Sequence, residues 1–333
     1  MHMSDALLSV AVGTTMNVVS TGTIGYCVTR IKRYDMEESK IPMMGVMGAF
    51  IFAAQMINFT IPVTGSSGHI GGGILLAALL GPFPAVITLA SVLLIQCLFF
   101  ADGGLLALGC NIFNIAILPC LVAYPLIYKS ILRKKLTPTR ITIATILSVV
   151  IGLQLGAFGV VLETLLSGVT ELPFGAFVVM MQPIHLAIGI VEGIVSAAVL
   201  CFIYRTRKSI LENALGMENA QSTSVKKTLI GILVAAIVLA GFVSWYASSK
   251  PDGLEWAIQK VTGGEELTTD SVIHDELQQV QETTALLPDY SVKTDEPVNE
   301  KVSTGLSGII GGGITLIAAS VMGFIIMIIK KRK

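Results

Sequence analysis

The stretch IHLAIGIVEGIVSAAVLCFIY, residues 184–204, is followed at once by the basic cluster RTRK at 205–208. A run of about 20 apolar residues is long enough to cross the ~30 Å hydrocarbon core of a bilayer as a helix, and a basic cluster is typical of the cytoplasmic end of such a span. The whole chain of 333 residues is 53% hydrophobic and 13% charged, with a mean hydropathy of +0.78. Soluble domains carry about 25% charged residues. The sequence therefore predicts an all-α, polytopic helical membrane protein.

Similar apolar runs precede this stretch, at 6–29, 41–62, 70–80, 85–100, 105–128 and 139–163. The run at 70–80 is too short for a confident span, so residues 70–101 form either two full crossings or a re-entrant hairpin. Either solution places the basic clusters at Arg30 and Arg133 on the same, cytoplasmic side. We expect seven spans in residues 1–208, with the N-terminus and His69 together on the extracytoplasmic side of the cell (inner) membrane.

The remainder of the chain reads as a polar cytoplasmic linker at 209–226 and a second unit at 227–333 with two spans, Thr228–Tyr246 and Leu306–Ile329. Between these spans, the segment Ala247–Thr304 carries twelve acidic residues and four lysines. On the extracytoplasmic side, such a segment could concentrate cations near the protein. The interpretation that we favour is a solvated, partly disordered loop.

Several function classes are excluded by composition and motifs. The net charge is zero, which gives no reason to expect a nucleic-acid partner. Five scattered cysteines without a Cys-x-x-Cys pair predict small apolar packing groups rather than a thiolate metal site. No basic segment precedes Ala6, so we expect no cleavable signal peptide and a retained N-terminus. HExxH, GxSxG and Walker A motifs are missing from the sequence, so we expect no enzyme, and ATP hydrolysis would need other subunits.

The first residues, Met1-His2-Met3, offer three nitrogens in succession: the Met1 amine, the His2 amide and the His2 imidazole. Binding through His2 Nδ1 would close a five-membered and a six-membered chelate ring about one metal. A planar nitrogen set suits Ni(II) or Cu(II). A fourth nitrogen is needed, and His69, in the stretch Thr64-Gly-Ser-Ser-Gly-His69, is the best candidate. We predict a metal site made by Met1, His2 and His69.

Polar residues near these ligands could support them. Ser66 and Ser67 could bond an imidazole and fix its tautomer, as could Asn58, although helix-end polar groups are an equal alternative. Asp5 could orient the bound N-terminus through an imidazole or amide contact. Glycines around His69 would let backbone segments approach closely.

The remaining histidines and the intramembrane acid have other expected roles. We expect His185 to cap or pack the start of the seventh span, and His274 to be exposed in the acidic segment. Glu192 lies within that span, where a carboxyl group is costly and often functional. It would either line a route for ions or hold a helix in place, and we favour the structural role.

The sequence also resembles a known family. MHMSDALLS at 1–9, TGSSGHIGGG at 64–73 and HLAIGIVEG at 185–193 resemble the substrate-binding M components of nickel and cobalt energy-coupling-factor transporters, over residues 1–208. PDGLE at 251–255 resembles the small module that acts as the N component. The family commonly has proline where Val10 stands here, which predicts a looser turn before the first helix.

The resemblance implies a seven-helix bundle into which the N-terminus folds back, and a metal held by the Met1 amine, the His2 amide and imidazole, and His69. It also implies a transmembrane coupling (T) subunit and two cytoplasmic ATPase (A) subunits as partners. The predicted function is metal capture for an ATP-driven importer of Ni(II), with Co(II) as an alternative cargo and no cofactor. The alternatives are a passive divalent-cation channel, and a membrane-anchored metal sensor or assembly protein.

Overall fold

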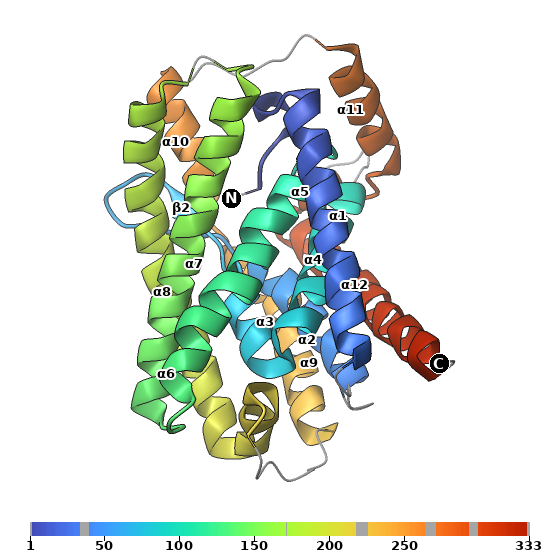
Figure 1. Cartoon of the computed structure of the whole chain (residues 1–333). Helices are drawn as coiled ribbons and strands as arrows, with labels where there is room; N and C mark the ends of the chain where they lie inside the picture. Colours follow the sequence, from blue (N-terminus) through green and yellow to red (C-terminus); the bar gives the residue numbers. More distant parts are fainter. Residues whose placement is uncertain are drawn as a thin grey trace.

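The computed structural model describes residues 2–33, 40–170, 172–217, 226–263, 271–292 and 299–331. Helices make up nearly all of the regular structure, as the sequence predicts (Figure 1). Five described helices are long and apolar enough to cross a membrane, at Pro82–Phe100, Leu108–Leu132, Pro138–Ser167, Phe174–Leu215 and Lys301–Ile329. The protein is therefore a multi-pass membrane protein, although length and hydropathy alone do not reproduce the expected count of seven plus two spans.

The first unit begins with a short 3₁₀ turn and continues through the helices that form the bundle. Its elements are η1 (Asp5–Leu7), α1 (Val10–Arg33), α2 (Lys40–Gln55), β1 (Phe59–Thr60), β2 (Ser67–Gly68), α3 (Gly73–Leu80), α4 (Pro82–Phe100), α5 (Leu108–Asn111), η2 (Ile112–Lys129), α6 (Ser130–Leu132), α7 (Pro138–Ser167) and α8 (Phe174–Leu215). Element η2 is a π-type helix that contains Pro119 and Pro125, and proline removes a donor from the regular α-helical ladder. The α7 and α8 helices pack side by side along the bundle (Figure 1).

The segment from His69 to Asp102 is a hairpin. Helix α3 has 8 residues, a rise of ~12 Å that cannot cross the membrane. Gly81, with a φ of 87°, turns the chain into α4, because such a left-handed conformation favours glycine. Both ends of the segment return to His2, whose ring lies 5.1 Å from the His69 ring and 3.2 Å from the Asp102 carboxylate. The chain therefore folds back on itself between His69 and Asp102, so that both ends of the segment lie at the same place in the bundle.

Helix α8 starts ten residues earlier than the sequence predicts, at Phe174, and includes Pro183 inside the helix. Residues 174–183, which lie outside the apolar runs identified in the sequence, are therefore helical, since neighbouring groups can re-satisfy the backbone that proline frees in a buried helix. His185 consequently lies in the body of α8 rather than at its start. It is buried, with 1% of its surface exposed.

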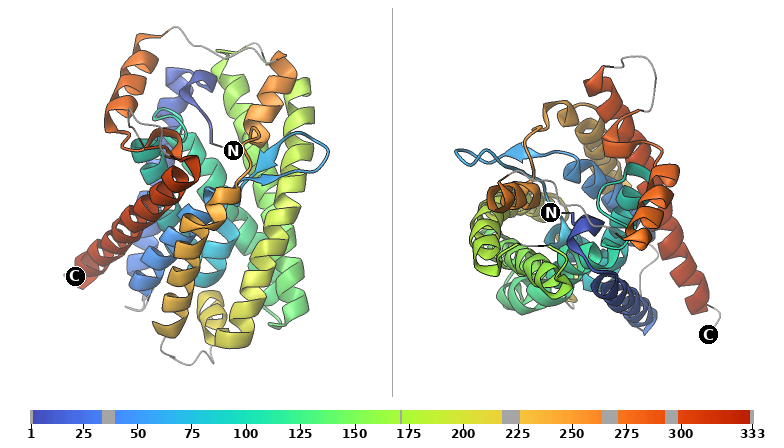
Figure 2. Two further views of the ribbon diagram at one scale, coloured as in Figure 1. Left: turned by 180° about the vertical axis from the view of Figure 1, so that it is seen from behind. Right: turned by 90° about the horizontal axis from the view of Figure 1, so that it is seen from above.

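The second unit is more ordered than the sequence predicts. Its elements are α9 (Lys226–Gly241), η3 (Val243–Tyr246), α10 (Gly253–Thr262), α11 (Val272–Thr284), η4 (Pro288–Tyr290) and α12 (Glu300–Lys331). Helices α9 and α12 pack on α2 of the first unit, while α10 packs on α8. The expected disordered loop is therefore wrong for the described residues 247–263 and 271–292. Figure 1 and Figure 2 show α10 and α11 toward the end of the bundle at which α1 begins.

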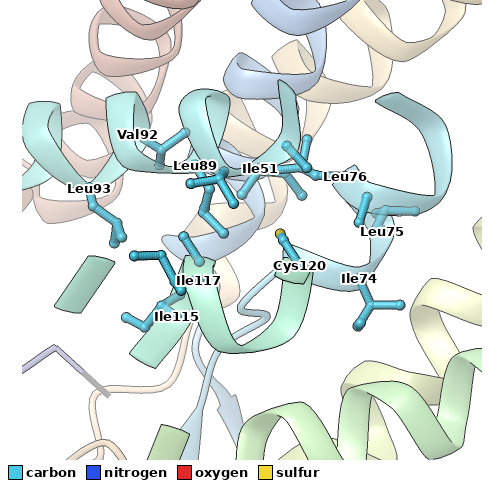
Figure 3. Packing of buried hydrophobic residues seen from close by; sticks show 14 of the residues in the cluster. Ile51, Ile74, Leu75, Leu76, Leu89, Val92, Leu93, Ile115, Ile117 and Cys120 are labelled. Carbon is cyan, nitrogen blue, oxygen red and sulfur yellow. The ribbon is translucent and has the colours of Figure 1, made fainter. Parts of the chain in front are cut away.

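One large apolar cluster makes up most of the core of the described residues, with a small second cluster at Ile61, Ile184 and Ile188. Around Cys120, the side chains of α3, α4 and η2 interdigitate with Ile51 of α2 (Figure 3). Four of the five cysteines are buried and all five are free, so the prediction that they pack as small apolar groups is confirmed. The Cys120 thiol donates to the Gly73 carbonyl at 3.3 Å, which helps to hold the start of α3.

Candidate metal centre

The side chains of His2 and His69 meet inside the bundle. Their ring centroids lie 5.1 Å apart with 12° between the ring planes. The His2 side chain is only 8% exposed, and the first residues descend between the helices (Figures 1 and 2). The structure thus brings together two of the three predicted ligand residues from positions far apart in the sequence. The third, Met1, lies outside the described residues.

The backbone next to His2 is held by a buried amide. Asn111 accepts the Met3 N–H through Oδ1 at 2.7 Å and donates its Nδ2 to the Met3 carbonyl at 3.2 Å. Gly104 donates its N–H to the same carbonyl at 2.9 Å. Because Met3 is itself fully buried, these bonds fix the chain one residue after His2. A paired amide of this kind leaves no sequence pattern, and the sequence did not reveal it.

Asp5 joins the N-terminal segment to a distant loop through a backbone amide. Its Oδ1 accepts the Ala107 N–H at 2.9 Å, so Asp5 joins the N-terminal segment to the loop after α4. Among the described residues, it makes no hydrogen bond to the His2 imidazole. Burial raises the pKa of the Asp5 carboxyl, and the backbone bonds from Ala107 and Leu106 oppose that shift. Asp5 therefore orients the N-terminal segment through the backbone of residues 105–107.

Asp102 faces the His2 ring. Its Oδ1 lies 3.2 Å from His2 Nδ1, and its Oδ2 accepts the hydroxyl of Tyr290 from the second unit. His2 Nε2 is buried and has no hydrogen-bond partner among the described residues. Burial lowers the pKa of His2, while the Asp102 charge opposes the shift. A chelate through Nδ1 therefore requires the metal to replace the Asp102 contact.

His69 follows a small antiparallel pair. Strand β2 pairs with β1, with Ser67 opposite Thr60 and Gly68 opposite Phe59. Gly68 is required there because a Cβ at this position would lie 2.5 Å from Ile188 of α8. Burial lowers the pKa of His69 well below 6.5. A neutral imidazole is the form that binds a metal, so burial prepares this ring as a ligand.

The polar residues expected to support the imidazoles bind the second unit instead. Ser67 donates its hydroxyl to the Lys250 carbonyl at 2.7 Å and its N–H to the Pro251 carbonyl at 2.8 Å. The Ser66 hydroxyl lies 3.0 Å from the carbonyl of Ser67 and 3.4 Å from the carbonyl of Pro251 in the second unit. Asn58 accepts the Ser248 N–H at its backbone carbonyl at 2.7 Å. These residues therefore dock the second unit against the segment that carries His69.

The PDGLE stretch is the centre of this docking. Asp252 caps α10 through the N–H groups of Leu254 and Glu255, and the Glu255 side chain accepts the Asp252 N–H in return, which makes a capping box. Trp256 then donates its indole N–H to the Thr64 carbonyl at 2.9 Å. The motif is thus a rigid helix start that binds the loop before His69. The spacing of Asp252 and Glu255 is typical of a capping box and could have revealed the helix start, whereas no sequence pattern indicates the surface that it covers.

The other two histidines are both buried. His185 Nδ1 lies 2.8 Å from the Met181 carbonyl, while its Nε2 has no partner among the described residues. A cavity of about 20 Å³, lined by His69, His185, Ile188 and Gly253 among others, adjoins this ring and has room for one water. His274 is 8% exposed and its Nε2 lies 2.9 Å from the Leu8 carbonyl. The expectation that His274 is exposed is therefore wrong, because α11 covers the first turn of the chain.

Side chains alone do not complete a metal site here. Within the described part of the chain, no group of three or more His, Cys, Asp or Glu side chains is placed to hold a metal ion. Two imidazoles need further donors to make a four-coordinate site. The backbone at the start of the chain carries further nitrogen directly beside the His2 side chain.

The fold and the site define a multi-pass helical membrane protein with a buried histidine pair beside the start of its chain. Residues 2–210 match the family described as the cobalt uptake substrate-specific transmembrane region, and residues 226–328 match the PDGLE domain. The chain belongs to this family, so the resemblance found in the sequence is confirmed.

Named relatives and solved structures agree with this assignment. A putative fused nickel transport protein NikMN of Archaeoglobus fulgidus is 30% identical over 316 residues, 95% of this chain and 96% of that one. A putative cobalt transport protein CbiM 2 of Methanosarcina barkeri is 36% identical over 137 residues, 41% of this chain and 57% of that one. The crystal structure of a truncated transition metal transporter aligns with a TM-score of 0.54 and 28% identity, over 62% of this chain and 99% of that one. The chain is therefore a member of a metal uptake family and carries two family regions.

Proposed function

We propose that this protein is the substrate-capture subunit of an ATP-driven, energy-coupling-factor-type importer of Ni(II). The metal is held by the amine of Met1, the amide and imidazole nitrogens of His2, and the imidazole of His69. The observation that carries the proposal is the buried contact between the His2 and His69 rings, 5.1 Å apart. The fused nickel transport relative supports nickel as the cargo, and the cobalt transport relatives make Co(II) the second candidate.

The choice of metal follows from the proposed ligand set. Four nitrogens that include a deprotonated amide form a strong, planar field, which Ni(II) accepts more readily than Co(II). Copper would bind more tightly on affinity alone. Selection against copper then depends on its availability to the cell and on the partner subunits.

The orientation of the chain is inferred from charge. Lys129, Arg133, Lys134 and Lys135 lie with Lys208 around one hollow at the α6 end of the bundle, and Figure 1 shows α10 and α11 at the other end. Basic residues favour the cytoplasmic side. This charge distribution supports an extracytoplasmic placement of His2, His69 and the PDGLE stretch, so that the metal is captured from outside the cell membrane.

The proposed partners are a transmembrane coupling subunit and cytoplasmic ATPase subunits, since the sequence contains no Walker A motif. Nickel uptake into vesicles that contain this chain alone should be absent. Uptake without ATPases would support the passive channel instead.

Nickel titration of the purified full chain tests the capture role. We expect one Ni(II) per chain, and a loss of more than about 100-fold in affinity in His2→Ala and in His69→Ala, since even residues behind the ligands contribute 10–100-fold. His274→Ala is the matched control, because it removes a buried histidine that bonds only the Leu8 carbonyl among the described contacts. Equal losses in all three variants would contradict the proposed ligands.

A further inference from the structure

The carboxylate of Glu192 holds the backbone directly after His69. Its Oε2 accepts the Gly71 N–H at 2.9 Å and its Oε1 accepts the Gly72 N–H at 2.8 Å. Glu192 is 3% exposed and lies within α8, far from His69 in the sequence. Both of its oxygens therefore bind a segment only two and three residues from the proposed ligand.

A second buried side chain holds the same segment from the opposite direction. Gln55, at the end of α2, donates its Nε2 to the Gly71 carbonyl at 2.9 Å and is 5% exposed. The peptide groups of Gly71 are thus bonded to α8 through the N–H and to α2 through the carbonyl. Gly72, with a φ of 81°, adopts the left-handed conformation that glycine favours. This conformation turns the chain into α3 directly after the two N–H groups that bind the carboxylate.

The bonding explains why a carboxyl group is retained inside a membrane helix. A buried carboxylate is costly in the membrane, and two charge-assisted bonds from successive N–H groups offset part of that cost. An ionised carboxylate offers two acceptor oxygens and no donor, which matches two N–H donors. A glutamine would direct an NH₂ group at one of them.

We propose that Glu192 is a positioning residue for metal capture, which together with Gln55 fixes the segment 70–72 and so sets the place of the His69 imidazole. This inference rests on the proposed role of His69 as a ligand. It assigns to Glu192 neither contact with the metal nor a route for ions. Of the two roles that the sequence left open for Glu192, it deepens the structural one into a specific function at the site.

The test compares Glu192→Gln with Glu163→Gln in nickel titrations of the purified full chain. Glu163 is also a buried acid within a membrane helix, 6% exposed, but it bonds Asn114 rather than the His69 segment. We expect Glu192→Gln to weaken nickel binding about 10–100-fold, the range for groups that orient a ligand, and Glu163→Gln to leave it unchanged. The absorption spectrum of bound nickel should move toward that of His69→Ala only in Glu192→Gln.

A double-mutant cycle shows whether Glu192 acts through His69. In the His69→Ala background, Glu192→Gln should cause no further loss of nickel affinity. Additive losses, or equal effects of Glu192→Gln and Glu163→Gln, would overturn the proposal.

Gln55→Met provides a second variant that removes one bond to Gly71 while keeping side-chain length. We expect the same direction of change and a smaller loss of nickel affinity. A Glu192→Gln variant that yields no folded protein, together with a Gln55→Met variant that binds nickel with wild-type affinity, is a further informative outcome. That pair of results would mean that Glu192 contributes only to general stability, and it would overturn the proposal. If the wild-type chain binds no nickel, the proposed function is wrong. If the wild-type chain binds nickel and Glu192→Gln binds it with the same affinity, only the role of Glu192 is wrong.

Discussion

Gly68→Ala tests how the position of His69 depends on the contact between β2 and α8. The added Cβ would lie 2.5, 2.8 and 3.0 Å from Cγ1, Cδ1 and Cγ2 of Ile188. Ordinary carbon contacts are ~3.5–4.0 Å, so the strand, the Ile188 side chain or both must shift, by roughly 1 Å in total. Overpacking of this kind typically costs about 1–3 kcal/mol. Because His69 is the next residue, its ring must move with the strand.

We expect Gly68→Ala to lower the thermal midpoint of the detergent-solubilised chain and to weaken nickel binding about tenfold or more, since ligands must be held within about 0.5 Å of their working geometry. Ile188→Ala removes all three clashing atoms, so the double variant should regain most of the nickel affinity. Gly22→Ala is the matched control, because its Cβ meets nothing within 4 Å. Unchanged nickel affinity in Gly68→Ala, or no rescue by Ile188→Ala, would refute this account of how His69 is positioned.

Three further outcomes are expected. Nickel affinity should fall as the pH drops from 8 to 6, by about tenfold per pH unit for each proton released on binding. Because burial lowers the pKa of His69 well below 6.5, its ring stays neutral over this range, and the protons measured by calorimetry should come from the backbone ligands. A nickel affinity that does not change with pH would count against the His2 amide as a ligand. Trp256→Phe removes the hydrogen bond to the Thr64 carbonyl and should cost about 0.5–1.5 kcal/mol of stability, which limited proteolysis should detect as faster cleavage of the second unit. Protease resistance equal to that of wild type would show that this bond does not hold the second unit in place. Val10→Pro should stabilise the chain by about 0.4–1 kcal/mol, because Val10 is the first residue of α1 and the fixed φ of proline suits a helix start. The thermal midpoint of unfolding measures this, and a lower midpoint than wild type would contradict it.

Much of the architecture could be predicted because hydrophobic length and basic clusters are local signals. The apolar runs identified the membrane helices, and both topologies expected for residues 70–101 return the chain to the side from which it starts, as the contacts of His69 and Asp102 with His2 require. The start of α8 was misplaced, since Pro183 suggests a break to a reader of the sequence, whereas the buried helix continues through it. The helices α10 and α11 were missed because a charged segment between two spans has the composition of a loop.

The meeting of His2 and His69 was predictable because both motifs were expected on the same side of the membrane. The groups that hold them were not. Asn111, Glu192 and Gln55 each bind backbone atoms of a distant segment, and a side-chain-to-backbone bond imposes no pattern on the residue that supplies the backbone. Ser67 was singled out for a role at the imidazole, but it binds the second unit, whose docking surface could not be deduced from composition.

The central claim is that the start of the chain supplies backbone nitrogen to the metal. An N-terminal extension of a few residues blocks the Met1 amine as a terminal donor and changes no side chain, so nickel stoichiometry and affinity should be measured on the extended and the authentic chain. The proposal predicts one tightly bound Ni(II) for the authentic chain and a loss of more than about 100-fold for the extended one. Equal nickel binding by both chains would contradict the claim.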